Sequence, residues 1–406
     1  MKTVVIGIIG AGASGMAAAL AASENPNVQV ILMERQARVG KKLSATGNGR
    51  CNLSNLHASA SGYYGEEPQF AEPAIRSFGV ENTLRWFRDL GLHTVWEESG
   101  RVYPYSDQAN SVVDVLRFAL NRPNISLCTG FEVQSIKREH GRFLVKGQDD
   151  VISCDRLIVA SGGLAGTKLG GSMSGYKLLR SMGHSATKLR PALVQLCSEW
   201  SGCASLKGVR ANCHAAVLCD GRLHRQSAGE IQFTEYGLSG PVIFEVSRDA
   251  CFGGGDWTCR LDFLPDLTME ELFTELNRRR ETGWNGEDLF IGILHNRLGR
   301  ILTQWAGIKA MDKLCDLRED QILAACRGAK EFEISLREPM GMDSAQVTAG
   351  GIVTREFDPE TMESKLVPGL YACGEVLDID GDCGGYNLQW AWSSGRLAGC
   401  SAGETL

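Results

Sequence analysis

The sequence predicts an α/β protein in which one doubly wound domain is interrupted by an insertion. Three observations support this prediction. Residues 3–34 have the pattern of a buried strand, a glycine-rich turn, an alanine-rich helix and a second buried strand, the length of one βαβ unit. From about Pro191, short alternating stretches replace this pattern. It returns at 345–353 and leads to a closing helix at 386–402.

Length and charge restrict the architecture and the partners. The chain has 406 residues, and at about 150 residues per domain this indicates two or three domains. Apolar residues make up 43% and charged residues 22%, as in an ordinary globular protein. The net charge of −6 provides no general attraction to polyanions, so no DNA partner is expected, and an RNA partner would need a local basic patch.

The fourteen cysteines form no Cys-x-x-Cys pair, so neither a zinc ribbon nor a thioredoxin-like redox pair is indicated. Most lie singly in apolar runs, as reduced thiols of cytosolic proteins do, and we expect a cytoplasmic location. The alternative is a metal held by Cys197, Cys203, Cys213 and Cys219, but their spacing is not that of a ligand set. We expect no metal.

An uncharged run at 4–22 superficially resembles a signal peptide or a membrane span. It contains Gly7, Gly10, Gly12 and Gly15, which neither kind of segment needs. The run is better explained as strand, turn and helix, and we expect no membrane association.

Hydrophobic periodicity predicts the remaining elements in order. Helices are expected at 72–90 with an interruption near Gly79, and at 111–120, 267–280, 289–308 and 319–326. Strands are expected at 95–105 as a hairpin, and at 126–145, 155–160, 213–219, 229–233 and 369–373. The corresponding domains are a doubly wound domain at 1–190 and 345–406, an inserted small β-barrel-like domain at 191–260, a helical domain at 261–328, and a strand at 329–344 returning to the insertion.

Gly10-Ala11-Gly12-Ala13-Ser14-Gly15 fits the G-x-G-x-x-G pattern of dinucleotide-binding folds. The first glycine permits the turn, the second lets the backbone approach a pyrophosphate, and the third lets helix and strand pack closely. The helix N-terminus then presents N–H groups to the phosphates. Glu34 ends the next strand, where its carboxylate can bind an adenosine ribose and disfavours a 2′-phosphate.

The C-terminal part favours FAD over NAD. Residues 369–375 form a predicted strand that ends in Gly374-Glu375, and Gly384-Gly385-Tyr386-Asn387 precedes an apolar helix. The N-terminus of such a helix would stabilise negative charge on the pyrimidine edge of a flavin. A plain NAD dehydrogenase has no use for this second element, so a discontinuous Rossmann-like FAD-binding domain is predicted.

The polar loop at 41–52 follows the second strand and contains Asn48, Gly49, Arg50 and Asn52. Its position predicts that it lies along the flavin, where Arg50 could counter negative charge and the two asparagines could hold ring heteroatoms. The alternative is a solvated basic loop. Asp378-Ile379-Asp380-Gly381-Asp382 lacks the rest of a calcium-loop pattern, and a polar turn beside the cofactor is predicted there.

Several segments together resemble the BaiN/YhiN-type flavoprotein family, within the glutathione-reductase-like FAD superfamily. The matching segments are 10–15, Ser44 through Asn55 with its Gly-Arg-Cys-Asn run, Ser161-Gly162-Gly163, 229–241, 348–352, 361–365 and Gly384-Gly385-Tyr386-Asn387-Leu388-Gln389-Trp390-Ala391. The residues assigned to the FAD site are Gly10, Gly12, Ala13, Ser14, Gly15, Glu34, Arg35, Lys42, Asn48, Gly49, Arg50, Val133, Ser161, Gly162, Gly374, Glu375, Gly385, Asn387 and Leu388.

The resemblance implies an FAD-dependent oxidoreductase that uses NAD(P)H to reduce a conjugated C=C bond, with a bile-acid-type dehydro intermediate as one substrate class. Two alternatives stay open: reduction of a uracil ring in ribosomal RNA, and an amine or aminoketone oxidase using oxygen. No second G-x-G-x-x-G exists, so NAD(P)H would bind transiently over the flavin. A small-molecule substrate is expected and structured RNA is the alternative partner. Arg50, Cys51 and Tyr386 are the candidates for catalysis.

Overall fold

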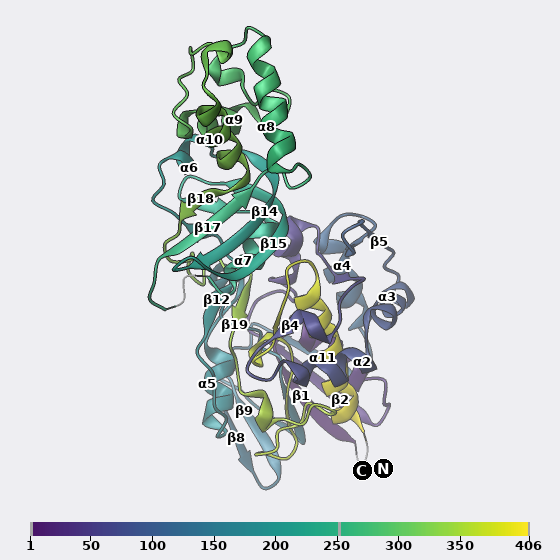
Figure 1. The fold of residues 1–406 in the computed structure, drawn as a ribbon. Helices are drawn as coiled ribbons and strands as arrows, with labels where there is room; N and C mark the ends of the chain where they lie inside the picture. Colours follow the sequence, from purple (N-terminus) through teal and green to yellow (C-terminus); the bar gives the residue numbers. More distant parts are fainter. Residues whose placement is uncertain (1–2, 251–252, 405–406) are drawn as a thin grey trace. The chain divides into compact units, whose positions relative to one another are not determined.

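The computed structural model describes residues 3–250 and 253–404 of the chain, which divide into two compact units (Figure 1). The first unit ends at Arg190 and resumes at Gln346, and the second spans Pro191–Ala345. Each unit has its own hydrophobic core.

A five-stranded parallel sheet forms the centre of the first unit. Its spatial order is β20 (Leu370–Ala372), β11 (Arg156–Val159), β1 (Val4–Ile9), β2 (Val28–Glu34) and β7 (Ile125–Thr129). The three inner strands, β11, β1 and β2, consist mostly of Val, Ile and Leu because both faces of a parallel sheet are covered. Since β20 pairs with β11, the last segment of the chain completes a sheet begun by the first.

Helices α1 (Ala13–Ala22) and α11 (Tyr386–Gly403) pack closely through small residues. Gly395, Gly399 and Gly403 recur at every fourth position of α11, on one face of the helix. A β-carbon on Gly399 would lie 2.8 Å from Ala18 Cα and 2.9 Å from Ala18 C, and one on Gly395 would lie 3.0 Å from Ser14 Cα. Only glycine therefore allows this approach.

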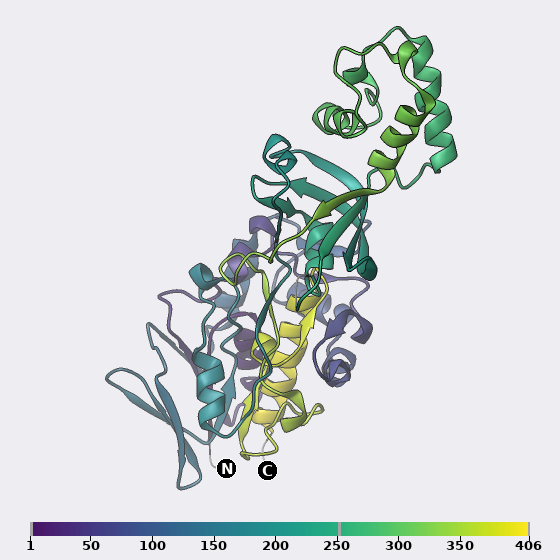
Figure 2. The same cartoon turned by 60° about the vertical axis from the view of Figure 1, so that its left-hand side comes forward.

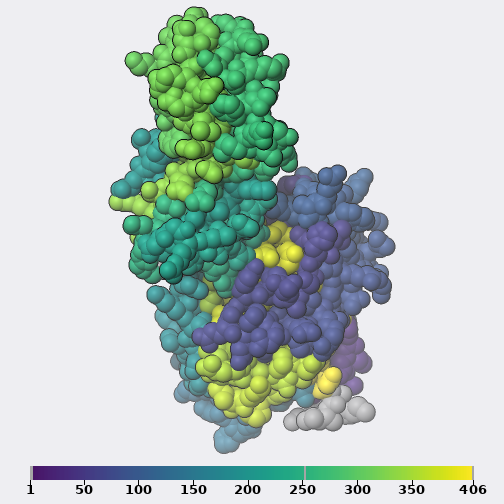
Figure 3. Space-filling view, in the orientation of Figure 1, coloured from purple at the N-terminus to yellow at the C-terminus, as the bar shows by residue number. Residues whose placement is uncertain are grey.

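The remaining helices of the first unit are α2 (Glu72–Ser77), α3 (Val80–Asp89), α4 (Ala109–Ala119) and α5 (Ser174–Ser181). One small sheet has the order β3 (Ser54–Asn55), β6 (Arg101–Pro104), β5 (Thr94–Trp96), and another has β10 (Val151–Cys154), β9 (Arg142–Lys146), β8 (Ser135–Glu139). In addition, β4 (Tyr63–Tyr64) pairs with β21 (Asp380–Gly381). Figure 3 shows purple N-terminal and yellow-green C-terminal segments sharing one face of this unit.

The second unit contains a six-stranded antiparallel sheet. Its order is β13 (Leu196–Cys197), β16 (Gly237–Ser239), β15 (Arg222–Phe233), β14 (Arg210–Cys219), β17 (Trp257–Asp262) and β18 (Phe332–Ser335). Helix α7 (Pro241–Ser247) contacts β15 and β14. Three longer helices, α8 (Met269–Arg278), α9 (Asn296–Trp305) and α10 (Glu319–Lys330), gather beyond one end of the sheet (Figure 2).

Two predicted elements need correction. The helix expected at 289–308 is too long: Gly292 has a φ of +75°, and the helix begins only at Asn296, after His295 Nδ1 accepts a hydrogen bond from Arg297 N. The strand β19 (Val347–Ala349), where the doubly wound pattern was expected to resume, pairs with β12 (Arg190–Ala192) and is not part of the parallel sheet.

Within residues 3–250 and 253–404, no helix has the length and apolar character needed to cross a bilayer. The same residues contain no group of three or more His, Cys, Asp or Glu side chains placed to hold a metal ion.

Candidate functional site

The predicted cofactor residues of the first unit converge at the carboxyl ends of neighbouring strands. Gly10 follows β1, Ser161 follows β11, Gly374 follows β20, and Glu34 ends β2. The chain leaves β1 for β2 on one side, while β11 flanks β1 on the other. Ligands of open parallel sheets bind at this kind of topological switch point.

The glycine-rich turn is shaped to approach a ligand. Gly10 has a φ of +102°, and a β-carbon there would lie 2.5 Å from the Ala160 carbonyl oxygen. A β-carbon on Gly15 would collide with the Gly10 carbonyl. At Gly12, in contrast, a β-carbon would meet nothing within 4 Å, so the space above this backbone is open. Together with the N-terminus of α1, this open space fits a pyrophosphate.

The Glu34 carboxylate is oriented by main-chain donors. Its Oε2 accepts a hydrogen bond from Ala11 N, and its Oε1 accepts one from Gln36 N, both at 2.8 Å. The side chain is thereby held beside the glycine turn, with acceptor capacity left for the hydroxyls of a ribose. The neighbouring Arg35 donates a hydrogen bond from Nη2 to the Gly170 carbonyl.

Lys42 and Glu375 bind each other, although they lie in separate predicted segments. Lys42 Nζ is 2.8 Å from Glu375 Oε2, and Glu375 Oε1 accepts a hydrogen bond from Thr348 N at 2.9 Å. Gly374, with a φ of +75°, would place a β-carbon 2.5 Å from Ser14 Oγ. The end of β20 therefore lies against the first turn of α1.

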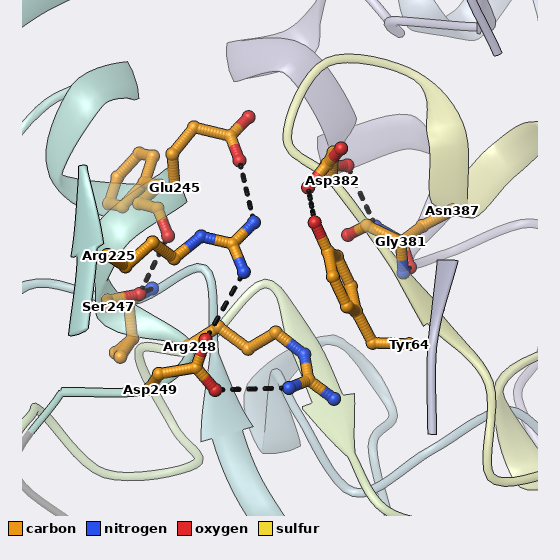
Figure 4. Close-up of polar contacts among 11 residues, drawn as sticks. Tyr64, Arg225, Glu245, Ser247, Arg248, Asp249, Gly381, Asp382 and Asn387 are labelled. Carbon is orange, nitrogen blue, oxygen red and sulfur yellow. Dashed lines mark hydrogen bonds and ion pairs between the residues drawn. The ribbon is translucent and has the colours of Figure 1, made fainter. Parts of the chain in front are cut away.

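The N-terminus of α11 begins after two glycines in the left-handed region, Gly384 and Gly385. The Asn387 side chain holds the preceding turn, because its Oδ1 accepts from Gly381 N and its Nδ2 donates to Gly381 O, both at 2.8 Å (Figure 4). Asn387 and Leu388 can thus contribute to the predicted cofactor site through the main-chain N–H groups of the first helical turn.

Asn52 provides a direct test of fit for the flavin. Its Oδ1 is buried and has no hydrogen-bond partner among the described residues. It lies 3.0 Å from the position of a β-carbon on Gly385, and therefore at the N-terminus of α11. A buried acceptor without a donor is costly, and the imide N–H of a flavin pyrimidine ring would satisfy it. The residues present therefore fit FAD.

The structure shows which groups surround the residues of the polar loop. Arg50, predicted as a countercharge for flavin or substrate, has two carboxylate neighbours of its own. Its Nε lies 2.5 Å from Asp107 Oδ1 and its Nη1 lies 3.2 Å from Glu97 Oε1, and the bond to Asp107 raises its pKa. Asn48 and Gly49 have φ values of 56° and 87°, and a β-carbon on Gly49 would face open space.

Three other residues were assigned to the cofactor site. Val133 is half-buried and packs on the core of the first unit. Ser161 and Gly162 follow β11, and Gly162 has a φ of +72° with no neighbour within 4 Å of a β-carbon position.

Of the catalytic candidates, Cys51 is buried and Tyr386 already has a hydrogen-bond partner within the protein. The Cys51 thiol is fully buried, and burial raises its pKa to about 12, so it is neither accessible nor a thiolate at neutral pH. The Tyr386 hydroxyl donates a hydrogen bond to the His57 carbonyl at 3.3 Å, and its ring meets Tyr63 edge-on at 6.0 Å.

Figure 4 also draws polar networks that lie within each unit. In the first unit, Tyr64 donates to Asp382 Oδ1 at 2.7 Å. In the second, Arg225 pairs with Asp249 at 3.2 Å and with Glu245 at 3.9 Å, and Arg248 pairs with Asp249 at 3.2 Å. Arg225 therefore has two carboxylate partners, which offset its charge.

Comparison with known proteins assigns the chain to a family. The model described as the HI0933-like protein Rossmann domain matches residues 3–401. The chain belongs to this family. A 3-dehydro-bile acid delta(4,6)-reductase from Clostridium scindens is 39% identical over 405 residues, which cover 98% of this chain and 99% of that protein. A ribosomal RNA dihydrouridine synthase from Escherichia coli is 29% identical over 392 residues, 95% of each chain.

Membership of the HI0933-like family confirms the predicted resemblance and makes the chain an FAD-dependent oxidoreductase. Among solved structures, a 3-ketosteroid delta1-dehydrogenase from Sterolibacterium denitrificans has a similar fold, with a TM-score of 0.50 at 12% identity over 99% of this chain and 100% of that one. The Rossmann-type α/β fold is therefore confirmed.

Proposed function

We propose that this HI0933-like protein reduces a conjugated C=C bond of a bile-acid-type dehydro compound or a similar enone, with NAD(P)H as the electron donor. The observation that carries the proposal is the full-length similarity to a reductase named for such a substrate. The matched region covers both units rather than the cofactor-binding part alone.

The geometry of the first unit supports a bound FAD as the redox group. The open backbone at Gly12, the oriented Glu34 carboxylate and the unpartnered Asn52 Oδ1 would hold its pyrophosphate, ribose and pyrimidine ring respectively. The chemistry that FAD supplies when bound is two-electron transfer between a nicotinamide and an electron-poor alkene. The N-terminus of α11 would favour negative charge near the pyrimidine edge.

The test is anaerobic reduction of the purified yellow protein with NADH and then NADPH, followed by addition of a 3-dehydro-bile acid with Δ4,6 unsaturation. The flavin absorbance should fall with one of the nicotinamides and return when the acceptor is added. The proposal would be contradicted if the folded protein did not retain FAD, or if no enone reoxidised its reduced flavin. Air reoxidation with an amine substrate, in place of enone turnover, would favour the oxidase alternative.

Ribosomal RNA is a second candidate substrate, because two relatives at 29% and 27% identity are named as ribosomal RNA dihydrouridine synthases. The arginines that gather at 278–280 and 297–300 do not favour RNA binding, because several of them pair with carboxylates. Arg278 and Arg279 both pair with Glu275, and Arg300 pairs with Glu287 at 3.1 Å. Salt-dependent binding of ribosomal RNA fragments, together with dihydrouridine formation in them, would establish RNA as the substrate.

The division of the inserted unit into a barrel-like part at 191–260 and a helical part at 261–328 stays a prediction. Separate expression of residues 191–345, followed by limited proteolysis, would test whether a cleavage site lies near 260.

A further inference from the structure

Reduction of a C=C bond requires a proton as well as two electrons, and neither Cys51 nor Tyr386 is well placed to supply one. A different tyrosine, Tyr103 on β6, has the properties of a proton donor. The residue is only 6% exposed, its hydroxyl forms no hydrogen bond with a described residue, and the hydroxyl oxygen is not among the fully buried polar atoms, so solvent or a ligand can reach it. A hydroxyl in such a position normally forms a hydrogen bond with water or with a ligand.

Tyr103 belongs to the face of the β3–β6–β5 sheet that is turned toward the polar loop. Val102 on the opposite face is fully buried in the core, while Arg101 shares the face of Tyr103, because side chains alternate along a strand. The Arg50 guanidinium lies over the Tyr103 ring, 4.0 Å from its centroid.

Tyr103 lies near Asn52 and the N-terminus of α11, as the surroundings of two glycines show. A β-carbon on Gly47 would lie 3.6 Å from Tyr103 Cε1 and 2.8 Å from Asn52 N. Asn52 carries the unpartnered Oδ1 at the N-terminus of α11. Arg101 Nε lies 2.9 Å from the β-carbon position of Gly384, the residue before that terminus.

We propose that Tyr103 is the catalytic acid of this enzyme and donates a proton to one carbon of the alkene. The inference rests on the proposed function. One alkene carbon receives a hydride, which carries the two electrons that originate in NAD(P)H. At the other carbon, a C–H bond forms as the Tyr103 O–H bond breaks. The phenolate left behind is then protonated by water.

The charges around the hydroxyl suit this role. Burial raises the pKa of Tyr103, Glu97 adds to the rise, and Arg101 and Arg50 oppose it. The hydroxyl is therefore protonated at neutral pH and available as an acid. The two guanidinium groups would stabilise the phenolate during turnover.

The test compares Tyr103→Phe with Tyr105→Phe, whose side chain is 76% exposed two residues away. In Y103F, FAD content and the rate of flavin reduction by NAD(P)H should match those of Y105F. Reoxidation by the 3-dehydro-Δ4,6-bile acid should slow by about 100-fold or more, the usual size of a lost general acid. Y103F should be equally slow across the pH range.

A measurement without turnover gives a second readout. In alkaline titration of the oxidised protein, the difference in tyrosinate absorbance between wild type and Y103F should show one group with a pKa above the ordinary value for tyrosine. If the enone reoxidises the reduced flavin of Y103F at a rate within twofold of that in Y105F, Tyr103 is not the catalytic acid, while the proposed function stands. A wild-type protein that holds FAD but reduces no enone would instead overturn the proposed function, and the proton donor with it.

Discussion

Substitution of Gly399 by alanine should destabilise the first unit, although alanine is the better helix former. In a helix interior, glycine to alanine gains about 1 kcal/mol. Here the added β-carbon would lie 2.8 Å from Ala18 Cα and 2.9 Å from Ala18 C, with the Ala18 carbonyl oxygen closer still. All three atoms belong to the backbone of α1, so relief requires the two helices to move apart.

The size of the effect follows from these opposing terms. Overpacking a well-packed interface costs about 1–3 kcal/mol, and contact with backbone atoms places Gly399 near the upper end. After subtraction of the helix-propensity gain, we expect a net loss of about 1–2 kcal/mol in the free energy of unfolding. This corresponds to a fall in Tm of about 2–8 °C for a unit of this size.

The matched control is Gly403→Ala in the same helix. A β-carbon there would lie 3.3 Å from both Ala22 Cα and Ala22 O, a spacing that small adjustments accommodate. In thermal unfolding followed by circular dichroism, the Tm of G403A should lie within about 2 °C of that of wild type. It should be well above the Tm of G399A. If G399A proves as stable as wild type or more stable, the close α1–α11 contact described above is wrong.

Three further outcomes are expected. Glu34→Ala should weaken FAD binding about tenfold or more, measured by fluorescence titration of apoprotein, because an oriented carboxylate is removed from the ribose position. Burial lowers the pKa of His184 despite its hydrogen bond to Glu356, so the folded state binds fewer protons than the unfolded state. The free energy of unfolding should therefore fall as the pH drops below about 6.5. In His184→Gln this loss of stability should be smaller. The Cys51 thiol should resist disulfide reagents in the native protein at neutral pH, while the exposed Cys315 reacts, as mass spectrometry of labelled peptides would show; rapid labelling of Cys51 would contradict its burial.

The sequence alone was sufficient for the features set by local pattern. The strand–turn–helix around Gly10–Gly15, the strand ending in Glu34 and the interruption near Gly79 all follow from short-range periodicity and backbone constraints. The switch-point arrangement also follows, because the carboxyl ends of parallel strands must share one edge of the sheet.

Side-chain partners could not be read from the sequence, because they depend on strand order and register between distant segments. Lys42 and Glu375 are 333 positions apart and meet only because β20 joins the N-terminal sheet. The sequence around Arg50 does not indicate that its guanidinium pairs with Asp107 and Glu97, which lie about fifty residues further along the chain. Tyr103 carries no motif, and its unpaired hydroxyl becomes evident only when β6, the polar loop and the start of α11 are folded together. Periodicity determines which face of an element is buried, whereas only the packed structure determines which polar groups find a partner and which are left for a ligand.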